Sequence, residues 1–577
     1  MAPPPRRLTA AFVALAVVFG LFGVRLVHLH GINASYLAGE AAGERTLAIT
    51  LPSVRGPILD TNGVPLATTV DAVNVVVDQV ALDNPAAAAL QMAALLGRDP
   101  AELQQVLTGV DAYVRVQRDV DGPTWAQIRD LGIEGIYSEP SVERAYPAGD
   151  VAGNLIGFIG NRDDQGADEA KIGQFGLEQS YEDVLAGKPG SLRYERDGAG
   201  RAIPLADQVR VEPTAGRGLR LTIDRDIQWF TEQALAAKVE ESRAQFGSAV
   251  VLDPRTGDIL ALAEAPHVDP ANPDATSEED RGSRAVAAPY EPGSVQKPLT
   301  MAAALDSGAV DPDDVFTVPD SIQRDGWPRP LSDFAPHEDW RLTPAGILAK
   351  SSNVGTILVA ERMDKDVMRD YLVKFGYADP PGLGMPGEVA ELPTDWSDLR
   401  RDTISYGQGV ATTVVHLAAA YGALANDGLR MPPRLVDTVV ESDGTERVVP
   451  HSEPVQVVSP ESAQAVVTMM EAVVAEGGTA SNVVVDGYRI AGKTGTAQVL
   501  SATGALEGFS ATFGGFAPAD DPQLVVVVSL HKPKQGRYGG QLGGPVFADV
   551  MEFALPRLGI APSGSPAPKV PIFADQQ

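Results

Sequence analysis

The chain has 577 residues, which is too long for a single hydrophobic core and predicts two or three folded units. Its 76 acidic and 46 basic residues give a net charge of -30, which argues against a nucleic-acid partner because phosphate binding requires a basic surface. The absence of cysteine excludes disulfides, thiolate metal sites and cysteine nucleophiles, and the seven histidines show no metal-ligand spacing, so we expect no metal and no cofactor.

The N-terminal region predicts a membrane anchor. The Pro-rich segment 1–7 ends in two arginines, and residues 8–24 form an uncharged apolar run. A helix over 8–29 would be roughly 33 Å long, enough to cross a hydrocarbon core of about 30 Å. The positive-inside rule places segment 1–7 in the cytoplasm and the rest of the chain outside. A cleaved signal peptide is the alternative, although the apolar run is long for one. Arg25 would reach the outer interface or face a partner helix.

The region after the anchor mixes strands and helices. Residues 54–66 predict a strand, a turn and a strand, because Asp60-Thr-Asn-Gly63 supplies side chains that tolerate positive φ. Residues 71–80 alternate in the manner of another strand, and helical patterns follow within 84–135. A change of composition at 212–218 marks the boundary of the next folded region.

The second region predicts an antiparallel sheet flanked by helices. Asp224 is a plausible N-cap of an amphipathic helix. Two strands at 248–252 and 259–263 follow, and a Val-rich strand at 524–530 returns late in the chain. From Ser563 onward the sequence is rich in Pro, Ser and Gly, and we expect this tail to be disordered.

The first candidate motif is Ser294-Val-Gln-Lys297. The pattern Ser-x-x-Lys is weak alone, and it also matches 529–532, where a strand would point the two side chains to opposite faces. Around Ser294, a preceding Pro-Gly and the apolar run 299–305 predict the start of a helix instead. The Lys297 amine could then take the Ser294 hydroxyl proton, provided that burial or neighbouring cations keep it neutral. The alternative is an incidental Ser and Lys in the first turns of a helix.

The second candidate motif is Ser351-Ser352-Asn353, which follows a helix-like stretch. In isolation it is typical of a polar cluster that caps or ends a helix. The functional interpretation is that Ser351 relays a proton to a leaving amine while Asn353 hydrogen-bonds a substrate amide.

The third candidate motif is Lys493-Thr494-Gly495-Thr496, in a strand-like stretch whose glycines permit close approach of a ligand. The alternative is an edge strand weakened by glycine. Functionally, Lys493 would supply positive charge, and Thr494 and Thr496 would donate hydroxyl hydrogen bonds to a carboxylate. The N–H of Thr496 would complete an oxyanion hole with that of Ser294.

In this order, the three motifs resemble the active-site set of penicillin-recognising serine acyltransferases. Nearly the whole chain resembles the class B penicillin-binding proteins, and most closely the division-type peptidoglycan D,D-transpeptidases of the FtsI or penicillin-binding protein 3 family. The stretches that carry this resemblance are 55–67, 144–147, 176–178, 290–297, 405–412, 418–428, 491–498, 539–540 and 545–547.

The resemblance implies an α+β protein with an N-terminal transmembrane helix, an extended α/β pedestal of the dimerisation type and a penicillin-binding transpeptidase domain. That last domain would hold an antiparallel sheet flanked by helices, with an all-helical insert. The expected boundaries are 1–7 for a cytoplasmic tail, 8–29 for the anchor, 30–215 for the non-catalytic pedestal, 216–558 for the transpeptidase domain and 559–577 for a disordered tail.

The resemblance also implies a reaction and partners. Ser294 would attack the penultimate D-Ala carbonyl of a peptidoglycan stem peptide, D-Ala would leave, and the acyl group would pass to an amine of a neighbouring, lipid II-derived strand. β-Lactams would imitate the substrate and stall as esters. The pedestal has no glycosyltransferase module, so a membrane glycosyltransferase of the FtsW type and other divisome proteins are the expected partners, at the septum.

Three alternatives stay open at this point. One is an elongation-type transpeptidase. Another is a hydrolase, either a D,D-carboxypeptidase or a β-lactamase, although the chain has no Glu-x-x-Leu-Asn string to activate a deacylating water. The third is a divisome scaffold or β-lactam sensor that does not turn over. The middle motif also departs from Ser-Asp-Asn, at a position to which the family assigns no chemistry.

Overall fold

The computed structural model describes residues 5–32, 46–160, 171–195, 208–325, 327–389, 392–500 and 505–576. Contacts divide the chain into two compact units. The first unit comprises Met1–Val54, Val70–Glu143 and Gly187–Gly216, and the second comprises Arg55–Thr69, Arg144–Ala186 and Arg217–Gln577. Two stretches of the expected pedestal, 55–69 and 144–186, therefore fold with residues 217–577.

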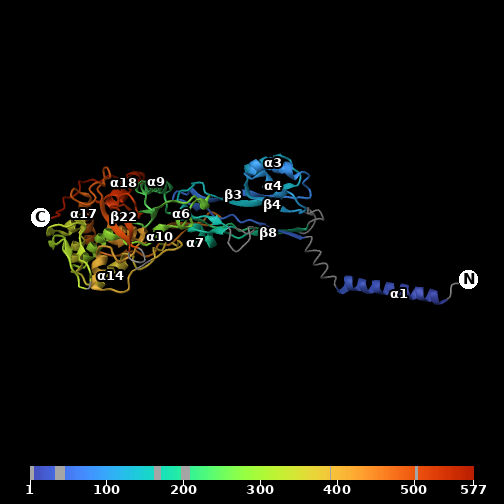
Figure 1. The fold of residues 1–577 in the computed structure, drawn as a ribbon, viewed down its shortest axis with the longest axis horizontal. Coiled ribbons are helices and arrows are strands. Elements are labelled where there is room, and N and C mark those ends of the chain that lie inside the picture. Colours follow the sequence, from blue (N-terminus) through green and yellow to red (C-terminus); the bar gives the residue numbers. More distant parts are fainter. Residues whose placement is uncertain are drawn as a thin grey trace. The chain divides into compact units, whose positions relative to one another are not determined.

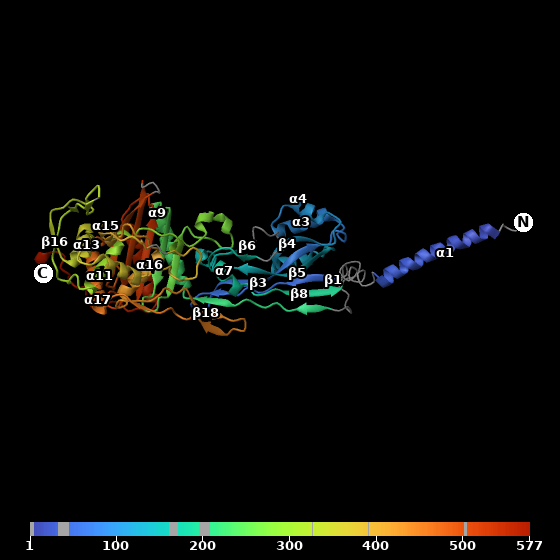
Figure 2. The same cartoon turned by 90° about the horizontal axis from the view of Figure 1, so that it is seen from below.

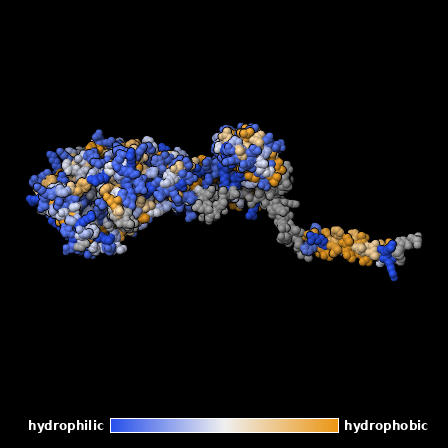
Figure 3. Space-filling view, in the orientation of Figure 1, coloured by the Kyte–Doolittle hydropathy of each residue, from blue (hydrophilic) through white to orange (hydrophobic). Residues whose placement is uncertain are grey.

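The N-terminal helix α1 runs from Pro5 to Val27 and is followed by a π-helical turn, His28–Ile32. The apolar span Arg6–Gly31 has a mean hydropathy of 2.4, and by length and composition it could cross a membrane. In Figure 3 this helix carries a hydrophobic band with hydrophilic residues toward each end. It matches the predicted anchor in place and composition.

The rest of the first unit is a small α/β body. Strands β1 (Thr46–Leu51), β8 (Gly190–Glu195) and β9 (Val209–Val211) pair antiparallel, in the order β1-β8-β9. A long strand β3 (Pro65–Val77) pairs antiparallel with β4 (Val114–Asp121), and β5 (Ile136–Ala145) also pairs with β3. Helices α3 (Pro85–Leu96) and α4 (Pro100–Leu107) lie beside these strands (Figure 1), and α5 (Gly122–Asp130) packs on β4. Each helix begins after an Asn or Asp cap and has proline at its first or second position, in agreement with the helical patterns expected within 84–135.

The two N-terminal stretches of the second unit, 55–69 and 144–186, are linked by a buried network of charged residues. Glu178, fully buried, accepts hydrogen bonds from Arg55 Nε at 2.5 Å and from Arg144 Nε at 2.7 Å. Nearby, β2 (Ile58–Leu59) pairs in parallel with β10 (Gly218–Leu221), which pairs antiparallel with β18 (Val436–Val440). The predicted turn at Asp60 follows β2, and its carboxylate accepts hydrogen bonds from two turn N–H groups, those of Asn62 and Val64.

The main sheet of the second unit has five antiparallel strands in the order β12-β11-β23-β22-β21. The strands are β11 (Phe246–Leu252), β12 (Ile259–Ala265), β21 (Ala491–Leu500), β22 (Leu506–Ala517) and β23 (Leu524–His531). On β22, Phe513 packs against Phe547 of helix α18 (Gly539–Arg557), while Gly514 faces Tyr421 of helix α16 (Val414–Ala425). Because adjacent residues of a strand point to opposite faces, these helices cover the two faces of the sheet. Helix α9 (Arg225–Ser242) packs beside α18 through stacked Phe230 and Phe553.

A long insert between β12 and β21 carries the first two motifs. Helices α11, α13 and α17 lie together in it (Figure 2). The insert was expected to be all-helical, and that expectation was wrong, because it also contains short paired strands of two or three residues, too short to leave a periodic pattern in the sequence. Its helices are α10 (Arg284–Ala287), η4 (Gly293–Gln296), α11 (Lys297–Asp306), α12 (Pro344–Lys350), α13 (Asn353–Ala360), α14 (Lys365–Lys374), α15 (Asp398–Ser405), α16 and α17 (Pro460–Val474). Its two-stranded pairs are β13–β16 (Phe316–Val318, Trp340–Leu342), β14–β15 (Ser321–Ile322, Leu331–Ser332) and β17–β20 (Leu429–Arg430, Val455–Gln456).

The C-terminal residues are ordered against the second unit, so the prediction of a disordered tail over 559–577 was wrong for the described residues through 576. Thr343 Oγ1 donates to the carbonyl oxygen of Pro571 at 2.6 Å, and Ile572 is only 9% exposed. Although the segment is rich in Pro, Ser and Gly, its few apolar residues pack into or against the hydrophobic core: Ile560, Val570, Ile572 and Phe573. The apolar residues do not recur every three or four positions, as they would on a packed helix. The described part of the segment is extended instead, with one short 3-10 turn at Ala574–Gln576.

Candidate active site

Ser294 lies in a tight turn at the start of a helix. The turn is a short 3-10 helix that continues directly into α11, with Gly293 at φ 60° on its first residue. A Cβ atom on Gly407 would lie 2.0 Å from the carbonyl oxygen of Gly293, so glycine is required there for the two backbones to approach. Tyr421 braces the turn by donating its hydroxyl to the carbonyl oxygen of Val295 at 2.8 Å. The predicted helix start is confirmed, with a 3-10 first turn.

The side chains of Lys297, Ser351, Asn353 and Lys493 meet at one place. Lys297 Nζ donates to the backbone oxygen of Ser351 at 2.5 Å, to Asn353 Oδ1 at 2.8 Å and to Ser351 Oγ at 3.3 Å. Lys493 Nζ donates to the same Ser351 Oγ at 2.9 Å. Four of the five residues predicted to be catalytic are thus connected in one hydrogen-bond network, and Ser294 stands one helical turn before Lys297.

Burial sets the electrostatics of the two lysines. Both side chains are fully buried. Burial lowers the pKa of Lys297 to about 7, although the Asp333 carboxylate opposes this. Burial, together with the charge of Lys297, lowers the pKa of Lys493 well below its ordinary value. The arrangement therefore supplies a neutral amine near physiological pH, which is what a general base beside a serine hydroxyl needs.

Ser351 and Ser352 occupy the corner between two helices. Helix α12 ends at Lys350, and Ser351 caps it with a left-handed backbone at φ 54° and ψ 39°. Ser352 then caps α13, accepting a hydrogen bond from the N–H of Gly355 at 2.8 Å. The helix-cap interpretation of this motif is correct for the backbone of Ser351 and for Ser352, while the side chains of Ser351 and Asn353 face the lysines. A non-glycine residue at positive φ is a strained feature that clusters at functional sites.

Asp333 supports this corner, and sequence reasoning missed it. Its carboxylate accepts hydrogen bonds from Ser352 Oγ at 2.6 Å and from the N–H of Val354 at 3.0 Å, at the N-terminus of α13. His337 contacts the same carboxylate at 3.0 Å and stacks on Trp340 with ring centroids 3.5 Å apart. Asp333 lies in irregular chain after β15, where no periodic pattern marks a buried carboxylate.

The third motif lies on β21, beside the Ser294 turn. A Cβ atom on Gly495 would lie 3.0 Å from the carbonyl oxygen of Pro292 and from Val295 Cγ1, so this glycine lets the strand pass close to the turn. The Thr496–Ala497 backbone lies against Gly293, within 3.4 Å of where a Cβ would stand. Thr494 Oγ1 lies 3.1 Å from Thr479 Oγ1. The third motif therefore lies beside both the Ser294 turn and Ser351.

An exposed aromatic cluster next to these segments was also missed. Phe334 directly follows Asp333, is 75% exposed and meets Tyr538 edge-on with centroids 5.6 Å apart. Tyr538 precedes Gly539, which packs against the Gly495 carbonyl. The Arg537 guanidinium stacks over both rings. Such a cluster cannot be read from the sequence because its members come from segments far apart in the chain.

Comparison with known proteins identifies the family. Residues 247–552 match the penicillin binding protein transpeptidase domain, and residues 50–221 match the penicillin-binding protein dimerisation domain. Penicillin-binding protein PbpB of Mycolicibacterium smegmatis is 34% identical over 97% of this chain and 92% of its own length. Peptidoglycan D,D-transpeptidase FtsI of Escherichia coli K12 is 31% identical over 96% of this chain and 92% of its own length.

A solved structure agrees with these matches. The crystal structure of penicillin binding protein 3 from Mycobacterium tuberculosis, complexed with ampicillin, superposes with a TM-score of 0.70 at 30% identity, covering 91% of this chain and 100% of that one. The expected α+β fold, with a dimerisation domain before a transpeptidase domain, is confirmed. The chain belongs to the class B penicillin-binding proteins.

Proposed function

We propose that this protein is a peptidoglycan D,D-transpeptidase that cross-links stem peptides through an acyl-enzyme on Ser294. The observation that carries this proposal is the convergence of two buried lysine amines on the Ser351 hydroxyl, beside the Ser294 turn. Relatives named as peptidoglycan D,D-transpeptidases support the choice of reaction.

Acylation follows from this geometry. Ser294 Oγ attacks the carbonyl carbon of the penultimate D-Ala, and its proton passes to the neutral amine of Lys297. The carbon–nitrogen bond then breaks, and the leaving D-Ala amine receives a proton through the Ser351 hydroxyl, which hydrogen-bonds both lysines. The product is an ester on Ser294 and free D-Ala.

Deacylation reverses the roles. The amine of a neighbouring stem peptide attacks the ester carbonyl and loses a proton to the same lysine–serine network, while Ser294 Oγ leaves and is reprotonated. The new amide is the cross-link. The sequence has no Glu-x-x-Leu-Asn string to activate a deacylating water, which favours transfer to an amine over hydrolysis.

The remaining motif residues are proposed to bind substrate. Asn353, which accepts from Lys297, would contact the amide of the stem peptide. Lys493 would face the terminal carboxylate together with Thr494 and Thr496, while Gly495 keeps the strand close. The N–H groups of Ser294 and Thr496 would form the oxyanion hole, in which one donor typically contributes ~3 kcal/mol of transition-state stabilisation.

Covalent labelling tests the proposal directly. The full chain, purified in detergent and treated with penicillin, is expected to carry one adduct located on Ser294 by peptide mass spectrometry. The Ser294→Ala variant should carry none and should lose cross-linking. An adduct on another side chain would reject Ser294 as the nucleophile. Release of the label from Ser294 within seconds would reject a stable acyl-enzyme and favour a hydrolase.

We further propose that α1 anchors the protein in the cytoplasmic membrane with residues 1–7 inside and residues from about 30 onward outside. In this arrangement 30–215 would form the non-catalytic domain and 216–558 the catalytic one. The natural absence of cysteine gives a clean test, because a single cysteine can be placed at Ala2 or at exposed Asp443. A membrane-impermeant maleimide applied to whole cells, with access to the outer face, should label only the Asp443→Cys variant.

The cellular role is proposed to be septal synthesis, with a glycosyltransferase of the FtsW type supplying glycan strands. The similarity to FtsI of Escherichia coli supports this over side-wall elongation. Depletion should give filaments or chained cells, whereas rounded cells would indicate elongation. If Ser294→Ala left cross-linking unchanged while recruitment continued, a scaffold role would replace the enzymatic one.

A further inference from the structure

The C-terminal segment 560–576 contacts the supports of two catalytic motifs, and its first contact is with α12. The Thr343 N–H donates to the carbonyl oxygen of Ile572 at 3.1 Å, and Thr343 Oγ1 donates to that of Pro571 at 2.6 Å. Thr343 is also the N-cap of α12, accepting from the N–H of Gly346 at 3.0 Å. A Cβ atom on Gly346 would lie 2.0 Å from the Ile572 oxygen, so the segment lies directly on the first turn of this helix.

The same segment reaches the other end of α12. Lys350, the last residue of this helix, places its ammonium 5.4 Å from the ring centroid of Phe573. Leu342 pairs with Phe573 just before the helix begins. Both ends of a two-turn helix are therefore in contact with residues 571–573, and the helix leads straight into Ser351.

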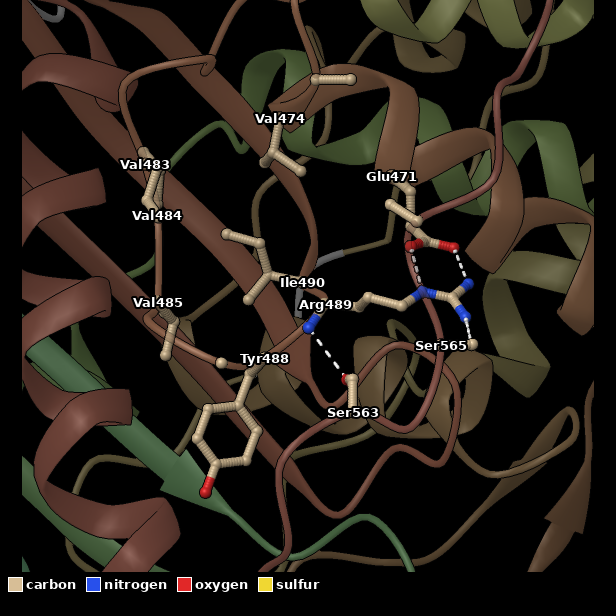
Figure 4. Close-up of a pocket in the computed structure, with 13 residues that line it drawn as sticks. Glu471, Val474, Val483, Val484, Val485, Tyr488, Arg489, Ile490, Ser563 and Ser565 are labelled. Carbon is tan, nitrogen blue, oxygen red and sulfur yellow. Dashed lines mark hydrogen bonds and ion pairs between the residues drawn. The ribbon is translucent and has the colours of Figure 1, made fainter.

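The second contact is with the segment that leads into β21. Figure 4 shows Arg489 at the centre of this contact: its N–H donates to Ser563 Oγ at 2.9 Å, and its Nη1 donates to Ser565 Oγ at 2.8 Å. The rest of the guanidinium pairs with Glu471 of α17 at 2.7 and 2.9 Å. Tyr488 donates its hydroxyl to the carbonyl oxygen of Ile560 at 2.7 Å. Arg489 stands four residues before Lys493 on a continuous path into the strand.

We propose that residues 560–576 act as a strap that holds α12 and the start of β21 in register, and thereby positions Ser351 and Lys493 for acylation of Ser294. The inference rests on the proposed transpeptidase function and names a positioning role, since no strap residue touches the reacting atoms. Ser351 Oγ and Lys493 Nζ lie 2.9 Å apart on separate elements, and the strap is hydrogen-bonded at the start of the helix that ends at Ser351 and at the residue four before Lys493.

The expected consequence is kinetic. A misplacement of about 1 Å can cost roughly 100-fold in rate when catalytic groups must meet in a fixed geometry. Loss of the strap should therefore slow acylation by about 10-fold to 100-fold per folded molecule. It should also shift the pH dependence of acylation, because the Lys297 amine bonds to the Ser351 backbone oxygen that the strap holds in place.

The experiment uses the full chain in detergent and the second-order rate of Ser294 acylation by a fluorescent penicillin, from pH 6 to 9. One variant ends at Lys569 and loses the contacts of Pro571–Phe573. A second, Thr343→Val, loses the hydroxyl hydrogen bonds to Pro571, Ile572 and Gly346 at nearly constant size, and Thr343→Ser keeps them. The matched control is Asp364→Ala, which removes the N-cap of α14 but touches no strap residue. Folded protein is quantified by thermal unfolding and resistance to proteolysis.

We expect the truncated and Thr343→Val chains to acylate at least 10-fold more slowly with a displaced pH midpoint. Thr343→Ser should restore the wild-type rate, and Asp364→Ala should lose stability without losing rate. Wild-type rates per folded molecule in both strap variants would overturn the proposal. If the truncated chain does not fold, the comparison of Thr343→Val with Asp364→Ala decides. Failure of the unaltered chain to be labelled at Ser294 would instead reject the proposed function itself.

Discussion

Lys297 and Lys493 donate hydrogen bonds to one atom, the hydroxyl oxygen of Ser351, at 3.3 and 2.9 Å. Two ammonium groups this close, both fully buried, repel each other, so burial and mutual charge favour loss of a proton from the pair. A substrate carboxylate arriving beside Lys493 would favour its charged form again. One hydroxyl can then pass a proton between a neutral amine and a charged one, which is the relay that the proposed reaction requires.

The first prediction concerns pH. Because Lys297 must be neutral to accept the Ser294 proton, and its pKa is lowered to about 7, the acylation rate should fall as pH decreases through about 7. The fall should approach tenfold per pH unit below that value. Stopped-flow or quenched labelling with a fluorescent penicillin at constant ionic strength measures it. A rate independent of pH between 5 and 8 would contradict the assignment of Lys297 as the base.

The second prediction separates the two adjacent serines. Ser351→Ala removes the hydroxyl that both lysines share and should lower the acylation rate by roughly 100-fold or more. Ser352→Ala removes a helix cap and a bond to Asp333, and should cost about 1 kcal/mol of stability with a much smaller change in rate. Unfolding curves and labelling rates on the same preparations distinguish the two. Equal kinetic losses would mean that the corner acts only as a structural unit.

The two Ser-x-x-Lys matches show how much of the structure could be predicted from the sequence. Spacing and local context correctly predicted a helix start at Ser294 and a strand at Ser529, the second Ser-x-x-Lys match, because residue period and a neighbouring Pro-Gly distinguish the two. They could not locate Asp333 or the packing of Ile572, because both lie in irregular chain whose partners are distant in sequence. The sequence also could not show that stretches 55–69 and 144–186 fold with the second unit. They are joined to each other by the buried hydrogen bonds of Arg55 and Arg144 to Glu178, residues that are distant in sequence.

The third prediction tests the backbone around the nucleophile. In Gly407→Ala the new Cβ would lie 2.0 Å from the Gly293 carbonyl oxygen, so the Ser294 turn must move and acylation should fall at least about tenfold. Gly409→Ala is the matched control: it also has positive φ, at 77°, but its nearest neighbour is 3.4 Å away. Both variants carry the same backbone strain, so a selective loss in Gly407→Ala isolates the close contact. Equal rates would show that the turn tolerates the displacement.

The fourth prediction concerns the buried ion network. Glu178→Gln leaves buried Arg144, whose side chain is 2% exposed, without its carboxylate partner, and leaves Arg55, 8% exposed, with only Glu182 at 2.8 Å. Removing one partner of a buried ion pair typically costs about 3–5 kcal/mol, so the second unit should unfold at markedly lower temperature or denaturant concentration. Glu241→Ala, which breaks the exposed pair with Lys238, should cost about 1 kcal/mol or less. Similar losses in both variants would contradict a special role for the buried network.

The fifth prediction concerns a buried acid away from the active site. Burial raises the pKa of Glu232 to about 8, although hydrogen bonds from Gln228 and from the N–H of Ala152 oppose the shift. The folded state therefore keeps a proton that the unfolded state releases near pH 4.5. The resulting stability is fully present below pH 4.5 and is lost as pH rises through about 8.

Glu232→Gln keeps an acceptor oxygen for Ala152 and cannot ionise, so it should remove this loss. Relative to the unaltered chain, the variant should gain roughly 1–4 kcal/mol of unfolding free energy at pH 8 and little at pH 4.5. Some pH dependence should remain, because burial also raises the pKa of Glu264 to about 7. Glu240→Gln, on the exposed side of α9, should leave the profile unchanged. Since Glu232 is a structural acid, labelling of Ser294 at neutral pH should stay at the wild-type rate; an identical pH slope in Glu232→Gln would show that the carboxyl is ionised in the folded protein.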